Sequence, residues 1–461
     1  MPSLRPLPNA FAPARPRAIT SIVCLAALAQ VSACVQGPPP GESAAETASS
    51  AEALHLRRTP TCDPDNGGIT LPQGFCALVV AENVGRARHL VVRRNGDLYV
   101  AINPARDGSD PGRFIALRDT DGDGRTDVTV TLATTGGNGV ALDPTEFLLY
   151  FAQNNRVLRY FLLPGVLRPV GAPATIVSGL PVDGDHTAKT IVLDQRGGFF
   201  LNIGSASNAC QVENRVPFSP GVDPCPELAV RAGIWHFDAW RLGQTQSDGR
   251  RFATGFRNAN ALDLQPATGE LWGVVNGRDQ LFENWPDRYT AADDREAPAE
   301  ELVRIRRGDD NGWPYCYEDP RLGDKVLAPE YGGDGRARGR CRRIPNAELT
   351  FPAHWAPLGM QFYTGRQFPA EYRGDAFVAT HGTRFPSPAE GPGYNVMRVR
   401  FSRGRAVSRE VFADGFTGGA TNLPEGAVNR PVGLAQGPDG SLYITSDQLP
   451  GRIWRVIYTG R

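Results

Sequence analysis

"GSLYITSD", residues 440–447, indicates the fold most directly, because its pattern returns along the chain. A turn residue is followed by an apolar or aromatic core and then by a small or polar end. This order is typical of a strand that follows a tight hairpin turn. Five other stretches share it: "GDLYVA" (96–101), "EFLLYFAQ" (146–153), "GGFFLNIGS" (197–205), "GELWGVVN" (269–276) and "GDAFVATH" (374–381).

The six copies predict an all-β fold, a six-bladed β-propeller with insertions in the later blades. The 52 glycines and 39 prolines among 461 residues also favour a turn-rich β architecture. The alternative is a β-sandwich in which generic strands resemble one another by chance. In a propeller the inner strands converge on one axis, so polar residues at strand ends are expected to line a single mouth.

The N-terminal residues predict export. Arginines precede an apolar run at 18–29, and "VSAC" follows, which resembles the bacterial lipobox. We therefore expect a lipoprotein signal peptide at 1–33 and lipidation of Cys34, the alternative being an ordinary cleavage site. Val35 after the cysteine favours the outer membrane, so the predicted location is the bacterial cell envelope, facing the periplasm.

The remaining chain divides into two parts. Residues 34–60 are rich in Pro, Ala, Ser and Gly and predict a flexible, disordered tether. Residues 61–461 form the predicted propeller domain. Basic and acidic residues number 49 each, so no net charge favours nucleic acid.

Six cysteines beyond Cys34 predict disulfides in an oxidising compartment. Six cysteines allow 15 connectivities, and their local spacing favours three short-range pairs. No C-x-x-C occurs, which disfavours a zinc or redox site. The predicted pairs are Cys62 with Cys76, Cys210 with Cys225, and Cys316 with Cys341.

One histidine lies beside an aspartate in "VDGDHTAKTIVLD", residues 182–194. A neutral imidazole at His186 has the chemistry of a general base, and Asp185 is placed to orient it through a bend or from further away. The alternative is a hydrogen-bonded structural histidine. His354 and His381 are expected to be structural.

Several stretches together resemble one known family, the soluble glucose/sorbosone dehydrogenases. The resemblance runs from about Cys62 to the C-terminus. It implies a six-bladed propeller that uses pyrroloquinoline quinone (PQQ) and oxidises a sugar, a sorbosone-like sugar aldehyde or a related alcohol by hydride transfer to the quinone C5. The stretches are "GDHTAKT" (184–190), "ATGFRNANALDLQPATGELWGVVNGRD" (253–279), "GDDNGWPYCY" (308–317), "MQFYTGRQFPAEYRGDAFVATHG" (360–382) and "NRPVGLAQGPDGSLY" (429–443).

The resemblance also implies catalytic roles. His186 matches the base that removes the hydroxyl proton, and Asp185 its supporting acid. Arg257 matches the arginine at the quinone oxygens, where a fixed cation stabilises developing negative charge. Asn258 matches a polar contact to the cofactor.

The cofactor's calcium and carboxylates have implied partners as well. "NGRD" resembles the turn whose carbonyls bind calcium, which implies Gly277 and Arg278 as donors with Asn276 beside them. Arg430 matches an arginine that pairs with the cofactor's carboxylates, and Arg384 is a further candidate.

The chain departs from the family at two positions. Asn395 stands in "GYNV" where relatives carry a lysine, which puts cofactor affinity in question. Val303 replaces an asparagine after two acidic residues, and of these Glu301 remains a candidate calcium ligand.

A separate loop, "DTDGDGRTD" (119–127), has the spacing of a calcium loop. Position 12 of the loop is Val130 rather than a glutamate, so weak structural calcium binding is expected. The alternative is a solvated hairpin loop. The candidate ligands are Asp119, Asp121, Asp123 and Asp127.

The sequence therefore predicts a lipid-anchored quinoprotein that acts on a small sugar or aldehyde. Without a C-x-x-C-H haem site, electrons are expected to pass to a quinone pool or a small carrier. A calcium-dependent propeller lactonase and a non-catalytic propeller that binds glycans or proteins are the alternatives. The arginines at 336–343 are expected to form a solvated loop, with docking of an electron acceptor as the alternative.

Overall fold

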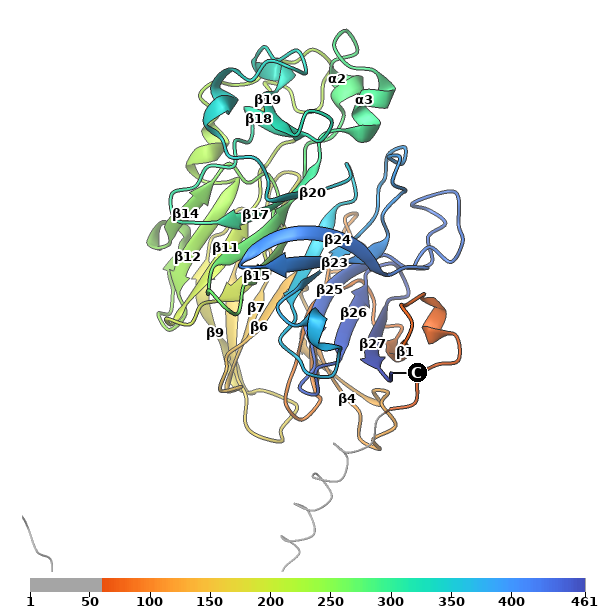
Figure 1. Ribbon diagram of the computed structural model, residues 1–461. Helices are drawn as coiled ribbons and strands as arrows, with labels where there is room; N and C mark the ends of the chain where they lie inside the picture. The colour runs from red at the N-terminus through yellow and green to blue at the C-terminus, as the bar shows by residue number, and fades with distance from the viewer. Residues whose placement is uncertain (1–59, 461) are drawn as a thin grey trace, which may run out of the picture. The chain divides into compact units, whose positions relative to one another are not determined.

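The computed structural model describes residues 60–460, which form a nearly all-β, six-bladed propeller (Figure 1). The predicted fold is confirmed. The predicted signal peptide, the lipidation site Cys34 and the tether as far as residue 59 lie outside the described residues.

Each blade is an antiparallel sheet whose four main strands run in order from the axis outward. Blade 1 contains β2 (Ala87–Val92), β3 (Leu98–Ile102), β4 (Arg113–Arg118) and β5 (Val128–Ala133). Blade 2 contains β6 (Gly139–Leu142), β7 (Leu148–Ala152), β8 (Val157–Phe161) and β9 (Val170–Ser178), and β13 (Gln244–Thr245) adds to it in parallel. Blade 3 contains β10 (Ile191–Leu193), β11 (Gly198–Ile203), β12 (Gly233–Asp238) and β14 (Arg250–Thr254).

The second half of the ring repeats this plan. Blade 4 contains β15 (Ala261–Leu264), β16 (Leu271–Val275), β17 (Glu300–Ile305) and β20 (Leu349–Phe351). Blade 5 contains β21 (Pro357–Phe362), β22 (Ala376–Thr380), β23 (Asn395–Ser402) and β24 (Arg405–Ala413). Blade 6 contains β25 (Pro431–Gln436), β26 (Leu442–Ser446), β27 (Arg452–Tyr458) and β1 (Phe75–Glu82).

The ring is closed at two radii. The first strands of successive blades contact one another around the axis, and β25 returns to β2. At the outside, β1 pairs antiparallel with β27, with Phe75 opposite Tyr458, so blade 6 joins both ends of the domain. Closure leaves no open sheet edge between the first and last blades.

The six recurring stretches all form the second strand of a blade: β3, β7, β11, β16, β22 and β26. These strands are buried on both faces because each blade packs between two others; Leu98–Ile102 and Leu442–Ser446 are buried throughout. Rings from neighbouring blades stack directly, as Phe114 and Phe151 do at 4.2 Å between centroids. Burial on both faces explains why these stretches form continuous apolar runs rather than alternating ones.

Blade 4 carries the largest insertion, which lies at the top of Figure 1. It includes α2 (Leu281–Asn284), α3 (Ala291–Glu296) and the hairpin of β18 (Cys316–Asp319) with β19 (Asp324–Leu327). Its own apolar cluster includes Leu281, Trp285 and Tyr317. Short 3₁₀ turns complete the described structure: η1 (Asn66–Gly68), η2 (Pro226–Ala229), η3 (Gln246–Asp248), η4 (Pro329–Tyr331), η5 (Gly339–Arg343) and η6 (Ala370–Tyr372).

The three predicted disulfides are confirmed. Cys62–Cys76 ties the N-terminal segment to β1, Cys210–Cys225 closes the long loop between β11 and β12, and Cys316–Cys341 braces the blade 4 insertion. Among residues 60–460, no helix has the length and apolar character needed to cross a bilayer.

Candidate active site

A cavity of about 1130 Å³ opens at one end of the propeller axis. Two kinds of segment line it: those that follow a second strand, such as Asn103 and Asn276, and those that lead into a first strand, such as Arg257 and Arg430. The first and second strands of a blade are antiparallel neighbours. The start of the first strand and the end of the second strand therefore lie together, at the same side of the propeller. This topology brings residues from all six blades to one cavity.

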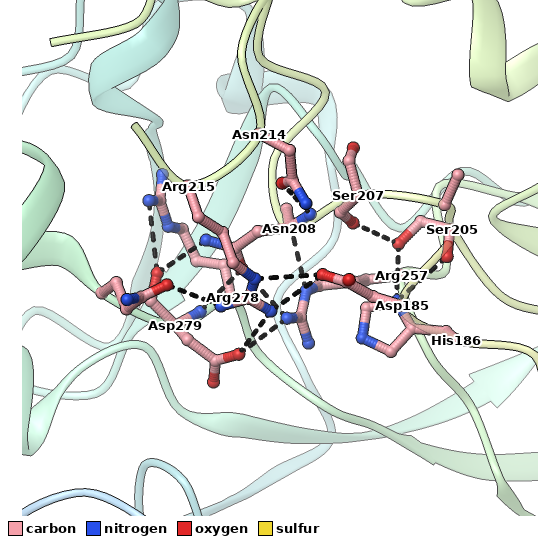
Figure 2. Close-up of polar contacts among 12 residues, drawn as sticks. Asp185, His186, Ser205, Ser207, Asn208, Asn214, Arg215, Arg257, Arg278 and Asp279 are labelled. Atoms are coloured by element: carbon pink, nitrogen blue, oxygen red, sulfur yellow. Dashed lines mark hydrogen bonds and ion pairs between the residues drawn. The ribbon is translucent and has the colours of Figure 1, made fainter. Parts of the chain in front are cut away.

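His186 lies in this cavity with its ring fixed by Ser205 (Figure 2). Its Nδ1 is 3.1 Å from the Ser205 carbonyl oxygen and 2.9 Å from Ser205 Oγ. The Ser205 hydroxyl donates to the Ser207 carbonyl at 2.7 Å, so both groups facing Nδ1 are acceptors. Nδ1 therefore carries the proton and Nε2 keeps its lone pair.

The surroundings keep His186 neutral. Burial, with the positive charge of Arg257, lowers the pKa of His186 well below its ordinary value. Close packing also fixes the residue, because a Cβ on Gly204 would lie 2.6 Å from the His186 Cβ. The imidazole is thus a rigid, uncharged proton acceptor near neutral pH.

Asp185 also lines the cavity, but it makes no hydrogen bond to His186. Its carboxylate accepts from Arg215 Nε at 3.0 Å. The prediction that Asp185 orients the histidine is corrected: Ser205 does so, because neighbouring side chains on an extended segment point in different directions.

Arg257 is held at four points and is 4% exposed. Its Nε donates to the Asn208 carbonyl at 3.1 Å, and Nη1 donates to the Gly277 carbonyl at 2.7 Å. Nη2 donates to Asn208 Oδ1 and to Asp279 Oδ2, each at 2.9 Å. A guanidinium has five N–H groups, so one is left for a ligand in the cavity.

Asp279 connects three cations. It accepts from Arg257 and Arg215, and its Oδ1 lies 3.6 Å from His354 Nδ1. Burial opposes its charge, but Arg257, His354 and Arg215 hold the pKa of Asp279 well below its usual range. Burial likewise opposes charge on His354, yet the nearby Asp279 carboxylate raises the pKa of His354 to about 9.

The opposite side of the cavity carries a second network around Asp447. This carboxylate contacts His381 Nε2 at 2.6 Å and Arg88 Nη1 at 2.8 Å. Burial lowers the pKa of His381 to about 4, although Asp447 opposes the shift. Arg430, which lies nearby, donates to the carbonyls of His381 and Gly382 at 3.0 and 3.1 Å.

Most predicted site residues meet in this cavity. The structure brings His186, Asp185, Arg257, Asn258, Asn276, Gly277, Arg384 and Arg430 to its wall. Glu300, next to the predicted ligand Glu301, also faces it and accepts from Gly277 N at 2.7 Å and Ala356 N at 2.9 Å. Burial raises the pKa of Glu300 to about 7.

Two predicted residues do not line the cavity. Arg278 was predicted through its carbonyl, which stays a prediction, and its side chain is buried in an ion pair with Glu330 of the blade 4 insertion. Glu301 accepts from Lys325 Nζ at 2.5 Å and Asn311 Nδ2 at 2.9 Å. Adjacent residues of a strand face opposite sides, so Glu300 takes the position predicted for Glu301.

The acidic loop between β4 and β5 is separate from this cavity. Asp119, Asp121 and Asp123 offer oxygens that lie within 4.8 Å of one another. Asp127 does not join them, because it accepts from the backbone N of Thr120 at 3.2 Å and also from its hydroxyl. The prediction of Asp127 as a fourth ligand is therefore corrected.

Sequence reasoning missed the partners that complete the site. His381 and Asp447 are the last residues of two recurring stretches, where the propeller itself places polar ends at the mouth. Asp279 closes the "NGRD" motif. His354 had no such signal, because it lies in the connection before β21; it lines the cavity and pairs with Asp279.

The residues present fit a carboxylate-bearing quinone and its calcium. Asn258 Oδ1 is buried without a hydrogen-bond partner among the described residues, although Asn258 Nδ2 donates to Asn276 Oδ1 at 3.0 Å. Arg384 and Arg430 offer cations for carboxylates, and the Gly277 carbonyl with the Asp279 and Glu300 carboxylates offers oxygens that suit a hard cation. Asn395, the departure from the family, lies outside the cavity wall and bonds to Thr380 Oγ1 at 2.9 Å.

Comparison with known proteins agrees with the fold. The TrAA12-like family model matches residues 69–459. A calcium structure of Trichoderma reesei carbohydrate-active enzyme family AA12 has a TM-score of 0.68 at 20% identity and covers 87% of this chain and 98% of that chain. The holo form of the pyranose dehydrogenase PQQ domain from Coprinopsis cinerea has a TM-score of 0.66 at 19% identity, and the match covers 87% of this chain and 98% of that chain.

More distant relatives extend the comparison. The apo form of the soluble aldose sugar dehydrogenase of Escherichia coli scores 0.55 at 14% identity, covering 83% of this chain and 99% of that chain. An uncharacterized protein of Borreliella burgdorferi is 29% identical over 206 residues, 45% of this chain and 48% of that protein. The chain thus matches about half the length of this curated relative.

Proposed function

The chain belongs to the TrAA12-like family, and on this basis we propose that it is a PQQ-dependent oxidoreductase acting on sugars. Structural relatives described as a PQQ-domain pyranose dehydrogenase and an aldose sugar dehydrogenase support the proposal. We propose a sugar, sugar aldehyde or related alcohol as the donor. The single observation that carries the proposal is that a neutral imidazole, a rigid guanidinium and two further arginines, Arg384 and Arg430, line one cavity.

The cofactor has a defined set of candidate partners. Arg430 and Arg384 would pair with its carboxylates, and Asn258 would accept or donate a hydrogen bond. Gly277, with Asp279 and Glu300, would hold calcium. When bound, PQQ would supply a two-electron acceptor whose C5 carbonyl takes the hydride, polarised by calcium as a Lewis acid.

His186 would remove the proton of the reacting hydroxyl group. The proton goes to Nε2, while Nδ1–H keeps its hydrogen bond to Ser205, so the ring does not have to turn. Arg257 would stabilise negative charge on oxygen with its remaining N–H, because its other four N–H bonds hold it in place. Asp279 positions Arg257 and compensates its charge.

The test is His186→Ala in protein loaded with PQQ and calcium. We expect PQQ affinity, measured by fluorescence titration, to stay within about twofold, while dye reduction with a panel of aldoses falls about 10²–10⁴-fold. His236→Ala is the matched control, since His236 pairs with Asp194 and does not line the cavity. Turnover of His186→Ala at the wild-type rate contradicts the assigned base, and lactone hydrolysis with calcium alone would favour the lactonase.

We also propose that the protein works in the bacterial envelope. The lipobox-like "VSAC" supports lipidation of Cys34, and several acyl chains would anchor the protein to a membrane facing the periplasm. The three disulfides agree with an oxidising compartment. Electrons would leave to a quinone pool or a small carrier.

A further inference from the structure

The cavity wall carries more positive than negative side chains. Seven arginines and five carboxylate residues line it. The cavity is therefore suited to anions. The arginines are Arg86, Arg88, Arg106, Arg215, Arg257, Arg384 and Arg430.

Most of these arginines are already committed to partners. Arg88 is bound by Asp447, while Arg215 and Arg257 are bound by Asp279. Arg430 donates to two backbone carbonyls. Among residues 60–460, Arg106 makes no hydrogen bond or ion pair, and it is exposed to solvent at the rim.

The loop after β3 carries Arg106 to the cavity wall. Residues 103–107 of this loop line the wall, and Asn103 N at the base of the loop donates to the Arg86 carbonyl at 2.8 Å. Partial burial, with the charges of Arg384 and Arg88, lowers the pKa of Arg106, while Asp447 and Asp185 oppose the shift. Asp185 precedes His186, so Arg106 is within electrostatic reach of both the catalytic histidine's segment and the arginine side.

A free guanidinium in this position lacks the anion that would complete it. Arg86 lines the same cavity and is only loosely paired, 3.9 Å from Asp110. A carboxylate bound between Arg86 and Arg106 would relieve the repulsion among the arginines and could form a bidentate pair. Arg384, which also makes no hydrogen bond or ion pair among residues 60–460, and the remaining N–H groups of Arg430 are left for the cofactor.

We propose that Arg106, with Arg86, forms a carboxylate subsite at the cavity rim, which selects acidic sugars such as uronic acids over neutral ones. The inference rests on the proposed function, because it names the substrate class for that site. The sugar would be oxidised at the carbon nearest His186, while its carboxylate lies at the rim. The cavity volume of about 1130 Å³ leaves space for a sugar beside a cofactor.

The test compares glucuronate with glucose, which differ in a carboxylate at one carbon. In holoenzyme at low ionic strength we expect kcat/KM for glucuronate to exceed that for glucose about tenfold, and the ratio to shrink with added salt. Arg106→Gln should reduce the ratio about tenfold, chiefly through KM for glucuronate, and Arg106→Lys should restore part of it. Arg94→Gln is the control, since Arg94 is exposed and lies outside the cavity.

Two measurements separate this inference from the proposed function. PQQ affinity, measured by fluorescence titration, should not change in Arg106→Gln. A loss of PQQ affinity of about the same size as the loss of preference for glucuronate would mean that Arg106 binds the cofactor, and it would overturn the subsite. Oxidation of neutral sugars without preference for glucuronate also overturns it while the proposed function stands. If no sugar reduces the dye, the proposed function is wrong. The subsite is then tested by calorimetry: binding of glucuronate to the wild type, and loss of that binding in Arg106→Gln, would still support it.

Discussion

His186 is suited to the proposed role of base, because its hydrogen bonds leave one nitrogen free and its burial keeps the ring neutral. The sequence identified this residue from one neighbouring aspartate, which is bonded to Arg215 instead. Ser205, the actual partner, is the last residue of a recurring strand stretch. Residue type is enough to propose a candidate base, whereas its hydrogen-bond partner depends on which strand end lies opposite.

His354 makes the stability of the protein depend on pH. Its pKa is about 6.5 when unfolded and about 9 when folded, so its ion pair with Asp279 contributes fully below pH 6.5 and is lost as pH rises through 9. We expect His354→Gln to be less stable than wild type by at most about 3 kcal/mol at about pH 6, and by much less at about pH 9.5. Urea unfolding of wild type and variant at both pH values measures this difference in stability.

Comparing the two proteins at each pH removes the contributions of groups that do not interact with His354. Glu300, whose pKa is raised to about 7 by burial, does interact with the charge of His354, so its ionisation as pH rises through 7 contributes to the measured difference. The free energy of unfolding should differ less between wild type and variant at alkaline pH. If this difference stays constant or grows toward alkaline pH, Asp279 does not hold His354 charged.

At the scale of elements, the loop between β11 and β12 builds one wall of the site. It supplies Asn208, whose two oxygens accept from Arg257, and Arg215, which joins Asp185 to Asp279 (Figure 2). Cys210–Cys225 closes this loop. The cysteine spacing predicted the disulfide but carried no indication that the closed loop holds the arginine.

Two disulfides of nearly equal span form a matched pair of tests. Replacing Cys210 and Cys225 with serine, or Cys62 and Cys76, opens loops of 15 and 14 residues, and each should cost about 3 kcal/mol of unfolding free energy. Only the first should weaken PQQ binding, because Asn208 then loses its fixed position. Urea unfolding and PQQ titration measure the two effects, and equal PQQ affinity in both variants would contradict the assigned role of the loop.

At the scale of the whole molecule, closure of the ring creates the site. β1 completes blade 6 against β27, and the first strands contact one another around the axis, so all six blades present their strand ends to one cavity. No two or three consecutive blades supply the complete wall, since Asp279 follows β16 of blade 4, Asp447 follows β26 of blade 6 and Asn103 follows β3 of blade 1.

The proposed anchor is also a property of the whole chain. We expect mass spectrometry of the mature protein from bacterial membranes to find an N-terminal Cys34 that carries acyl groups. Cys34→Ser should move the protein to the soluble fraction without changing PQQ affinity, because the cavity lies within residues 60–460. An unmodified N-terminus at another residue would contradict lipidation.

Local sequence was enough to predict the fold and the three disulfides, and the resemblance to the glucose/sorbosone dehydrogenases implied most of the residues at the cavity. Strand repeats, turn residues and nearby cysteine pairs are properties of neighbouring residues, and they remain visible in one dimension. Only the tertiary structure decided which groups face one another. Glu300 rather than Glu301 faces the cavity, and Ser205 rather than Asp185 bonds to His186. The ion pairs of Asp279 and Asp447 were likewise decided only in the folded chain. These depend on strand facing and on contacts between blades far apart in sequence, and electrostatic interactions act through space rather than along the chain.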